Sequence, residues 1–458
     1  MMRGVAGSLL LVASMLAPAA CVFETPIHAS DASDGFVLQL FDMTKYPTAV
    51  CLDGSSAGTV RRCLGSKSFQ LSAQSLSTIA SCLSYCSFGP ACSFAKTAAL
   101  RAGYYKRAGS GSGAKTYIIE LEGGGWCVDE SDCLARSKTA IGSSVSWPAT
   151  GCPGMDGGSN GLFSNDCTEN VNFCNATMLH LNYADGASFA GHRDEPINVS
   201  GTPIYFRGRD ILDAALKSFV FDEGMADAEV VILKGCSAGG LATILHLDYV
   251  AEVLATLAPD AKVIGLPDAG YFLDHNNTVG APTYTPIYQY VANMQNVSAS
   301  VDASCIAAYA PAEQWRCFLA QYTAPFLSTP AFFAQDLDDS WQQTNIFQLP
   351  CQPYAGTGNC DAAQMVLVDQ YRNDALAALT PVLQDPTHGA FLTDCVQHCH
   401  SNIAPCFNSA VVANQTLQET FFSWYQKTIF GIPPTIATKV IDTLVGTNPT
   451  CTRSCSPY

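Results

Sequence analysis

The stretch Val230-Val231-Ile232-Leu233-Lys234-Gly235-Cys236-Ser237-Ala238-Gly239-Gly240 joins an apolar, β-branched run to a corner of small residues. A buried strand needs a continuous apolar run of this kind. Beyond the corner, apolar residues recur at helical spacing and predict a helix. These residues are Leu241, Ile244, Leu245, Val250, Val253 and Leu254. The stretch therefore predicts a strand, a sharp turn and a helix.

Within the turn, Gly235-x-Ser237-x-Gly239 predicts a nucleophile elbow with Ser237 at its tip. Such a turn forces the serine backbone into a strained conformation in which neighbouring Cβ atoms would clash, so glycine is needed on both sides. The helix start behind the serine offers amide N–H groups to a developing negative charge. The pentapeptide also arises by chance in a chain with 36 glycines, so it is the flanking strand and helix that favour a functional elbow.

A second glycine cluster follows an earlier apolar, strand-like run and reads Glu122-Gly-Gly-Gly-Trp-Cys127. In hydrolases with a nucleophile elbow, backbone N–H groups of such a loop complete the oxyanion hole together with the amide after the serine. We therefore expect Gly124, Gly125 and Ala238 as donors, with Trp126 as a further candidate. Taken alone, the triple glycine fits a flexible turn equally well.

Strand-like and helix-like segments alternate along the chain. Residues 204–219 predict a helix before the elbow strand, and residues 263–266 and 331–335 predict two strands after it. Alternation of this kind is typical of βαβ units with right-handed crossovers. The sequence thus predicts an α/β fold, α/β-hydrolase-like, with a mostly parallel central sheet flanked by helices.

The ends of the chain indicate its domain organisation. Residues 1–20 have the positive start, short apolar core and small-residue cleavage site of a secretory signal peptide. We expect one α/β-hydrolase-like domain over residues 36–435, with a cysteine-rich insertion at 58–96 and a C-terminal tail at 436–458. No later stretch reaches the roughly 20 unbroken apolar residues of a membrane span, so we expect a secreted protein without stable membrane insertion. A lipoprotein anchored at Cys21 is the alternative.

The 21 cysteines fit a disulfide framework formed in an oxidising compartment. Their odd number leaves at least one thiol unpaired, and we expect this to be Cys236, as a small buried residue beside the elbow. Five Asn-x-Ser/Thr sequons are compatible with glycosylation. Their asparagines are Asn175, Asn198, Asn276, Asn296 and Asn414.

The formal net charge of −16 argues against nucleic acid as a partner, because phosphate binding needs a basic face. An acidic surface also repels polyanions at neutral pH. An acidic medium would ease this conflict if the substrate were an acidic polysaccharide. We expect the protein to be a monomer.

A serine hydroxyl needs a histidine to accept its proton and a carboxylate to orient the imidazole. In the order Ser, Asp, His, the histidine follows the acid, which leaves His388, His398 and His400. His398 is favoured because it lies between Cys395 and Cys399, where disulfides would hold its loop. The candidate acids are Asp336, Asp338 and Asp339, at the end of a predicted strand, and Asp268 as an earlier alternative. Spacing alone leaves both choices open.

Six motifs occur in the order found in the pectin acetylesterase family, which also contains the Notum carboxylesterases. They are Glu122-Gly-Gly-Gly-Trp-Cys127, Asp185-Gly-Ala-Ser-Phe189, Gly235-Cys-Ser-Ala-Gly-Gly-Leu241, Asp268-Ala-Gly-Tyr-Phe-Leu-Asp274, Asp339-Ser-Trp-Gln342 and Cys395-x-x-His398-Cys399. The chain resembles this family over roughly residues 50–402, apart from the cysteine-rich insertion.

The resemblance implies Ser237 as nucleophile, Asp339 as orienting acid and His398 as general base. It further implies that the oxyanion donors are Gly124, Gly125 and Ala238. The acyl-pocket residues that it implies are Trp126 and Phe272. Asp394 and His400 stand where the plant members of the family usually have Ser and Gln. Because both positions flank the expected base, this departure concerns substrate preference and the local pKa more than the reaction.

The resemblance also implies hydrolysis of a carboxylic ester through a covalent acyl-enzyme, with no metal or cofactor. Gly-Gly-Gly-Trp-Cys and Asp-Ser-Trp-Gln are similar to the plant-type members, which deacetylate pectin, whereas Notum-type enzymes remove a long fatty acyl chain from a protein. We therefore expect deacetylation of pectin or a related cell-wall polysaccharide. The alternatives are a Notum-like carboxylesterase and a secreted binding protein that has kept the fold without turnover.

Overall fold

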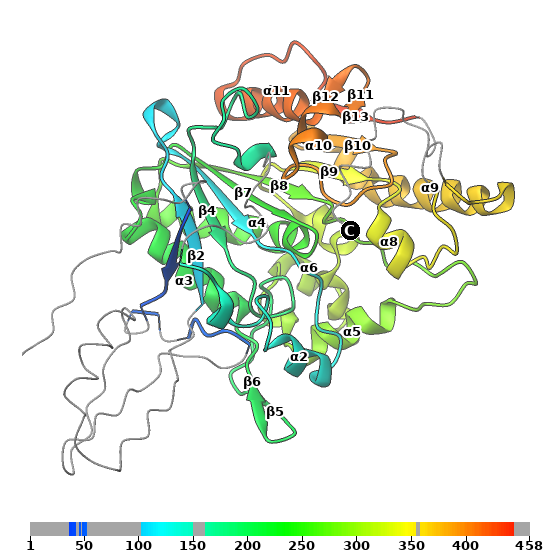
Figure 1. Ribbon diagram of the computed structural model, residues 1–458, viewed down its shortest axis with the longest axis horizontal. Coiled ribbons are helices and arrows are strands. Elements are labelled where there is room, and N and C mark those ends of the chain that lie inside the picture. The colour runs from blue at the N-terminus through cyan, green and yellow to red at the C-terminus, as the bar shows by residue number, and fades with distance from the viewer. Residues whose placement is uncertain are drawn as a thin grey trace, which may run out of the picture.

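The computed structural model describes residues 36–42, 45–46, 48–52, 102–149, 161–353 and 358–443. The expected signal peptide, the cysteine-rich insertion and the last fifteen residues of the expected tail lie outside these ranges. Figure 1 shows a central sheet with helices around it, and a short hairpin, β5 (Ile197–Val199) and β6 (Thr202–Ile204), that projects away from it.

The described part of the chain forms a nine-stranded sheet in the order β1-β2-β4-β3-β7-β8-β9-β10-β13. The strands are β1 (Val37–Leu40), β2 (Gly103–Arg107), β3 (Thr116–Leu121), β4 (Thr177–Leu181), β7 (Val230–Cys236), β8 (Lys262–Asp268), β9 (Phe332–Asp336), β10 (Gly389–Thr393) and β13 (Lys439–Ile441). Strand β2 pairs antiparallel with β1 and with β4, and all the other neighbours are parallel. The predicted mostly parallel α/β sheet is confirmed.

Helices connect the parallel strands and cover the sheet (Figure 1). They are α2 (Glu130–Arg136), α3 (Gly208–Phe221), α4 (Ala238–Leu257), α5 (Thr285–Met294), α6 (Ala303–Ala308), α7 (Ala320–Thr323), α8 (Ser340–Asn345), α9 (Ala362–Gln384), α10 (Ala404–Ser409) and α11 (Leu417–Phe430). A second small hairpin pairs β11 (Val411–Val412) with β12 (Gln415–Thr416). The helix expected over residues 204–219 is α3, and the strands expected at 263–266 and 331–335 are β8 and β9.

Alternate residues of the central strands face two separate cores, because successive side chains of a strand point to opposite faces. Ile119 and Leu233 belong to the core that includes α3, α4 and α9. Ile118 and Ile232 belong to the other core, where Trp424 of α11 is buried. Since both faces are covered, the strands are mostly apolar on both faces, which is why they read as largely apolar runs in the sequence.

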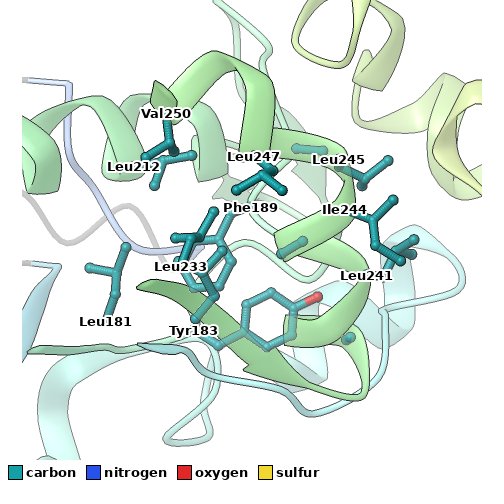
Figure 2. Close-up of a cluster of buried hydrophobic side chains, with 14 of the residues drawn as sticks. Leu181, Tyr183, Phe189, Leu212, Leu233, Leu241, Ile244, Leu245, Leu247 and Val250 are labelled. Atoms are coloured by element: carbon teal, nitrogen blue, oxygen red, sulfur yellow. The ribbon is translucent and has the colours of Figure 1, made fainter. Parts of the chain in front are cut away.

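Helix α4 follows the predicted elbow and packs on the sheet. Figure 2 shows its apolar side chains gathered with those of neighbouring elements, among them Leu233 of β7 and Leu212 of α3. By length and composition alone α4 could cross a membrane, yet 56% of its apolar window is buried inside the protein. We interpret it as the central core helix of the domain, and its apolarity serves packing against β7 and β8.

Residues 439–441, which the sequence analysis assigned to a C-terminal tail, form β13. This strand pairs parallel with β10 and adds an edge to the sheet beyond residue 435. A three-residue strand is too short to show the two-residue alternation by which strands are found in a sequence.

A buried polar row crosses the central strands next to the carboxyl end of the sheet. The strand register aligns Glu120 with His180 on β4 and with Lys234 on β7. Glu120 Oε2 lies 3.0 Å from His180 Nδ1, and Lys234 Nζ donates to Glu120 Oε1 at 3.1 Å. Burial alone would raise the pKa of Glu120, but the charge of Lys234 and the hydrogen bonds outweigh it and lower this pKa to about 2.

Replacing Lys234 with Met is expected to lower the free energy of unfolding by about 3–5 kcal/mol, because it leaves a buried carboxylate without its cation. Urea unfolding followed by circular dichroism measures the change. Since the pKa of Glu120 is lowered from 4.5 to about 2, the stabilisation is present above about pH 4.5 and is lost as the pH falls towards 2. The difference between wild type and variant should therefore shrink in acid.

Lys217→Met is the matched control, because Lys217 is exposed on α3. It is expected to change the unfolding free energy by less than about 0.5 kcal/mol. Equal effects of the two substitutions at neutral pH would contradict the role assigned to the buried pair.

Candidate active site

The carboxyl ends of the adjacent strands β3, β7, β8, β9 and β10 meet at one edge of the sheet. The glycine cluster at residues 123–125 follows β3, and Ser237 follows β7. Asp268 ends β8, Asp339 follows β9 and His398 follows β10. Open α/β sheets bind ligands at this edge. Segments far apart in the sequence are thus brought together where a site is expected.

Ser237 lies between β7 and α4 with φ +60° and ψ −126°, a backbone conformation that non-glycine residues rarely adopt. The flanking glycines allow the turn to close. A Cβ on Gly235 would lie 2.2 Å from the Gly239 carbonyl oxygen, and a Cβ on Gly239 would lie 1.9 Å from that of Leu121. The strained serine and the steric need for glycine are as expected for a nucleophile elbow. The Ser237 side chain is half-buried.

His398 and Asp339 form a buried pair, with His398 Nδ1 2.7 Å from Asp339 Oδ2. Asp339 is fixed as the N-cap of α8, because its Oδ1 accepts the Gln342 backbone N–H at 2.9 Å. Gln335 Nε2 also donates to Asp339 Oδ2, at 3.4 Å. A neutral imidazole that donates from Nδ1 carries its proton-accepting lone pair on Nε2, which is the tautomer a general base needs.

The environment of His398 acts on its pKa in two directions. Burial by itself would lower it, because the charged imidazolium is desolvated. The charge of Asp339 and its hydrogen bond outweigh burial, and the charges of Asp336 and Asp268 add to them. The net effect raises the pKa of His398 above the usual 6.5.

The ester-hydrolysis rate is expected to fall on the acid side with a pKa above 6.5, because a general base must be neutral. The measurement is kcat/KM for p-nitrophenyl acetate from about pH 5 to about pH 9, corrected for spontaneous hydrolysis. A rate that stays at its maximum well below the ordinary histidine pKa would contradict the assignment of His398.

A disulfide between Cys236 and Cys399 joins the residue before Ser237 to the residue after His398. The prediction that Cys236 is the unpaired thiol is therefore wrong. The loops after β7 and β10 lie at the same edge of the sheet, although 163 residues separate the two cysteines, and this proximity is not visible in sequence spacing. Cys395 is disulfide-bonded as well. The expectation that disulfides hold the His398 loop is confirmed.

A second histidine and acid pair lies beside the first. His400 Nε2 is 2.6 Å from Asp336 Oδ1, and both side chains are buried. Asp268 anchors the same loop, because its carboxylate accepts the backbone N–H groups of His400, at 3.0 Å, and Ser401, at 2.7 Å. These contacts leave Asp339 as the acid that meets His398.

The remaining candidates have other partners. His388 precedes β10 at the opposite edge of the sheet, where its Nδ1 accepts the Ala331 backbone N–H at 3.1 Å. Asp338 is buried and accepts a hydrogen bond from Gln343 at 3.3 Å. Asp394, at one of the two positions that depart from the plant members, accepts a hydrogen bond from Arg372 at 2.7 Å. Burial nevertheless raises the pKa of the Asp394 carboxyl to about 7.

The glycine cluster after β3 passes against the elbow. A Cβ on Gly123 would lie 3.4 Å from the Ser237 Cβ. Gly124 and Gly125 have φ of +133° and +64°, so both need glycine. Ala238, the first residue of α4, is buried directly behind the serine. The three expected oxyanion donors therefore come from segments that adjoin Ser237.

Two side chains that the sequence analysis did not identify fix the peptide groups of this loop. Arg136 Nη1 donates to the Gly124 carbonyl oxygen at 2.8 Å, and the Tyr183 hydroxyl donates to that of Gly125 at 2.9 Å. The Arg136 guanidinium also lies over the Tyr183 ring, 4.5 Å from its centroid. Oriented backbone dipoles are what an oxyanion site requires. No local motif marks these two residues as partners of the loop.

Aromatic rings lie beside the His398–Asp339 pair. Trp126 donates from Nε1 to Ser188 Oγ at 2.8 Å, and its ring centroid lies 4.9 Å from that of Phe272 and 5.6 Å from that of Trp341. The ring centroids of Phe272 and Trp341 lie 6.1 and 6.3 Å from that of His398. Phe272 thus lies beside His398 and Trp126 lies beside Phe272, and their role in an acyl pocket stays a prediction. Trp341 was missed, although it belongs to the quoted motif around Asp339.

The cluster continues away from His398. Tyr284, Tyr288 and Phe318 also contact Trp126, with ring centroids 6.3, 5.4 and 6.1 Å away. Tyr288 and Phe318 are fully buried, and desolvation raises the pKa of Tyr288 well above its usual value. A continuous group of packed rings therefore extends from His398 through Phe272 and Trp126 to Tyr288 and Phe318.

These groups supply what acyl transfer to a serine requires, namely a strained serine, an imidazole oriented by a carboxylate, and backbone amides at a helix start and a glycine loop. Within the described ranges, no group of three or more His, Cys, Asp or Glu side chains is placed to hold a metal ion.

Comparison with known proteins adds independent findings. The family model for pectinacetylesterase matches residues 100–452. Pectin acetylesterase 5 of Arabidopsis thaliana is 33% identical over 360 residues, which are 76% of this chain and 79% of that protein. Pectin acetylesterase 11 of the same plant is 33% identical over 70% of this chain and 81% of its own length. Palmitoleoyl-protein carboxylesterase NOTUM of Homo sapiens is 30% identical over 53% of this chain and 48% of its own length.

Proposed function

The chain belongs to the pectinacetylesterase family and is a carboxylic ester hydrolase, and we propose that it works as a serine esterase with the triad Ser237, His398 and Asp339. The observation that carries the proposal is the buried 2.7 Å contact between His398 and Asp339 at the sheet edge that also holds the strained Ser237. Covalent acyl transfer to serine needs this combination of nucleophile, oriented base and acid.

In the proposed mechanism, Ser237 Oγ attacks the ester carbonyl carbon while His398 Nε2 takes the hydroxyl proton. The N–H groups of Gly124, Gly125 and Ala238 stabilise the oxyanion that forms. The imidazolium then gives its proton to the leaving alcohol oxygen, and an acyl-serine remains. A water molecule then attacks the acyl carbon while His398 again takes the proton. The carboxylic acid is released and the Ser237 hydroxyl is restored. Asp339 stabilises the imidazolium in both halves.

We place a small acyl group, acetyl, in the acyl pocket. The rings of Trp126, Phe272 and Trp341 support this choice, because they pack edge to face against one another beside His398. The higher coverage of the relatives named pectin acetylesterases supports it too. The substrate would then be acetylated pectin or a related acetylated polysaccharide.

The test is release of acetate from acetylated pectin and from acetylated xylan, together with hydrolysis of p-nitrophenyl acetate and p-nitrophenyl palmitate. We expect rapid hydrolysis of the acetyl ester and at least one acetylated polysaccharide. A preference for the palmitate ester would favour the fatty-acyl alternative. Absence of all hydrolysis would favour a binding protein on this fold.

We further propose that the protein is a secreted glycoprotein. The disulfides of the described chain and the start of the sequence support secretion. The asparagine of each sequon is exposed, as glycosylation requires. Recovery of the protein from the medium of a eukaryotic host, with a mass that falls on enzymatic removal of N-glycans, is the expected result. Retention inside the cells would contradict it.

A further inference from the structure

A cavity of about 620 Å³ lies beyond α8 from the catalytic pair. Asp339 caps the start of α8, and Phe347, just past the end of this six-residue helix, lines the cavity. Six helical residues rise about 9 Å. A second segment also connects the proposed triad with the cavity. Phe272, whose ring adjoins His398, is followed two residues later by Asp274 in the cavity wall. The cavity therefore lies one short helix away from the proposed triad.

The lining combines hydrogen-bonding groups with apolar surfaces. Polar atoms come from Asp274, Asn276, Thr278 and Gln370, and apolar surface comes from Phe347 and Leu367. Among the described residues that line the cavity there is no lysine or arginine. Mixed polar and apolar walls suit a sugar ring, whose hydroxyls donate and accept hydrogen bonds while its C–H faces pack against carbon.

The acidic group of the wall is held in place. The Asp274 carboxylate accepts hydrogen bonds from the hydroxyls of Thr285 and, at 2.7 Å, Tyr322. His275 Nε2 lies 3.1 Å from Asp374, which is a second carboxylate near the rim. Both carboxylates are hydrogen-bond acceptors by nature. The wall therefore offers hydrogen-bond acceptors to a ligand that donates hydrogen bonds.

The neighbouring loop is also ordered by its own contacts. Asn277 Oδ1 accepts the backbone N–H groups of Val279, at 3.1 Å, and Ala281, at 2.9 Å. Its Nδ2 donates to Gln348 Oε1 at 2.8 Å, which ties the loop to the segment after α8. Binding sites for small ligands are usually preformed in this way. The cavity does not need a rearrangement to accept a ligand.

The charge of the cavity discriminates between sugars. An ionised uronate would meet Asp274 and Asp374 with no lysine or arginine among the described lining residues, and the lining His275 is already engaged by Asp374, on a protein whose net charge is −16. Like charges a few ångströms apart repel by about 1 kcal/mol even in water. An uncharged sugar has no such penalty, and its hydroxyls can donate to the same carboxylates.

The acid medium that would relieve this repulsion does not suit the proposed chemistry. Asp339 raises the pKa of His398 despite the opposing effect of burial, so the neutral base is favoured by raising the pH and not by an acid medium. Uronates are ionised under those conditions. The enzyme would therefore work at a pH at which the uronate groups of the substrate are ionised and are repelled by the cavity.

We propose that this cavity is a glycan-binding subsite that holds an uncharged sugar unit of the substrate chain next to the acetylated one. The proposal rests on the proposed esterase function and narrows its substrate class. A neutral acetylated glycan, or a stretch of galacturonan whose carboxyls are methyl-esterified, fits the subsite. A stretch of free galacturonate does not.

The test compares two acetylated oligogalacturonides that differ only in methyl esterification of their carboxyls. At neutral pH, kcat/KM of the wild type is expected to be about fivefold higher or more for the methyl-esterified form. The Gln370→Lys variant places a cation at the rim and should narrow or invert this preference. The assays use enzyme produced in a host that adds no N-glycans, because Asn276 belongs to a sequon, its glycan would compete for the cavity, and enzymatic removal of that glycan would leave an aspartate in the wall.

Ala362→Lys is the matched control, since Ala362 is exposed at the start of the same helix, about 12 Å from Gln370 and further still from Asp374, and does not line the cavity. It should leave the preference unchanged. Hydrolysis of p-nitrophenyl acetate should be equal in the wild type and the control variant, which separates failure of the subsite from failure of the esterase function. A wild type that prefers the free-acid form, or equal effects of the two lysines, would overturn the proposal.

Discussion

The Ser237→Ala variant is expected to hydrolyse p-nitrophenyl acetate with kcat lowered by about 10⁴-fold or more. The hydroxyl at the tip of the elbow is the group that would bond covalently to the acyl carbon, and alanine offers no substitute. The residual rate would come from the oxyanion donors and from binding alone.

The fold should survive this substitution, because the Ser237 side chain is half-buried and makes no cap hydrogen bond to α4. Thermal unfolding should therefore match the wild type. Ser146→Ala, at an exposed serine of the connecting segment before residue 150, is the control and should keep full activity. Retention of more than about one per cent of the wild-type rate by Ser237→Ala would contradict the assigned nucleophile.

The second large effect is expected for Asp339→Asn, with kcat lowered by about 10⁴-fold. Asparagine still caps α8, since its side-chain oxygen accepts the Gln342 N–H, so helix and fold are retained. An amide can donate to His398 Nδ1, however, which favours the wrong tautomer of the imidazole. Loss of the negative charge also removes the main cause that raises the pKa of His398. The acid limb of the residual activity should therefore move to lower pH.

Asp336→Asn provides the comparison, because Asp336 belongs to the same strand end but pairs with His400. Its effect on kcat is expected to be far smaller than that of Asp339→Asn. The measurement is the full pH dependence of kcat and kcat/KM for both variants. A larger loss with Asp336→Asn would assign the orienting role to the second pair.

The features that the sequence predicted well are local ones. The elbow needs glycine at positions 235 and 239, because backbone oxygens of nearby residues would clash with a Cβ atom at either position. This need appears in the sequence as a contiguous motif around Ser237. Gly124 and Gly125 are recognisable for a similar reason, since their positive φ requires glycine. The parallel sheet followed from apolar strand runs, because both of its faces are covered.

The pairing of side chains from different strands was not predictable from spacing. Asp336 and Asp339 are three residues apart, and His398 and His400 two, so only the fold decides which acid meets which histidine. The resemblance selected Asp339 and His398, and the geometry places these two in contact. The partner of Cys236 was missed for the same reason, since β7 and the loop after β10, which carries Cys399, meet at the carboxyl edge although β8 and β9 separate the two strands in the sheet.

Supporting residues escaped detection because their role depends on distant partners. Arg136 and Tyr183 hold the glycine loop from a helix and from the end of another strand. Glu120 and Lys234 sit in strands that look uniformly apolar apart from these two side chains, and only the register places them side by side. A buried charge inside a strand run is the one sequence signal that marks such a pair, because an unpaired charge there is costly.

Active-site labelling tests the central claim most directly. A fluorophosphonate that mimics the tetrahedral intermediate should inactivate the enzyme with a single adduct, and peptide mass spectrometry should place that adduct on Ser237. Labelling should slow strongly in His398→Ala, because the serine then lacks its base. Inactivation with the adduct on another residue, or full labelling of Ser237 without loss of ester hydrolysis, would contradict the account.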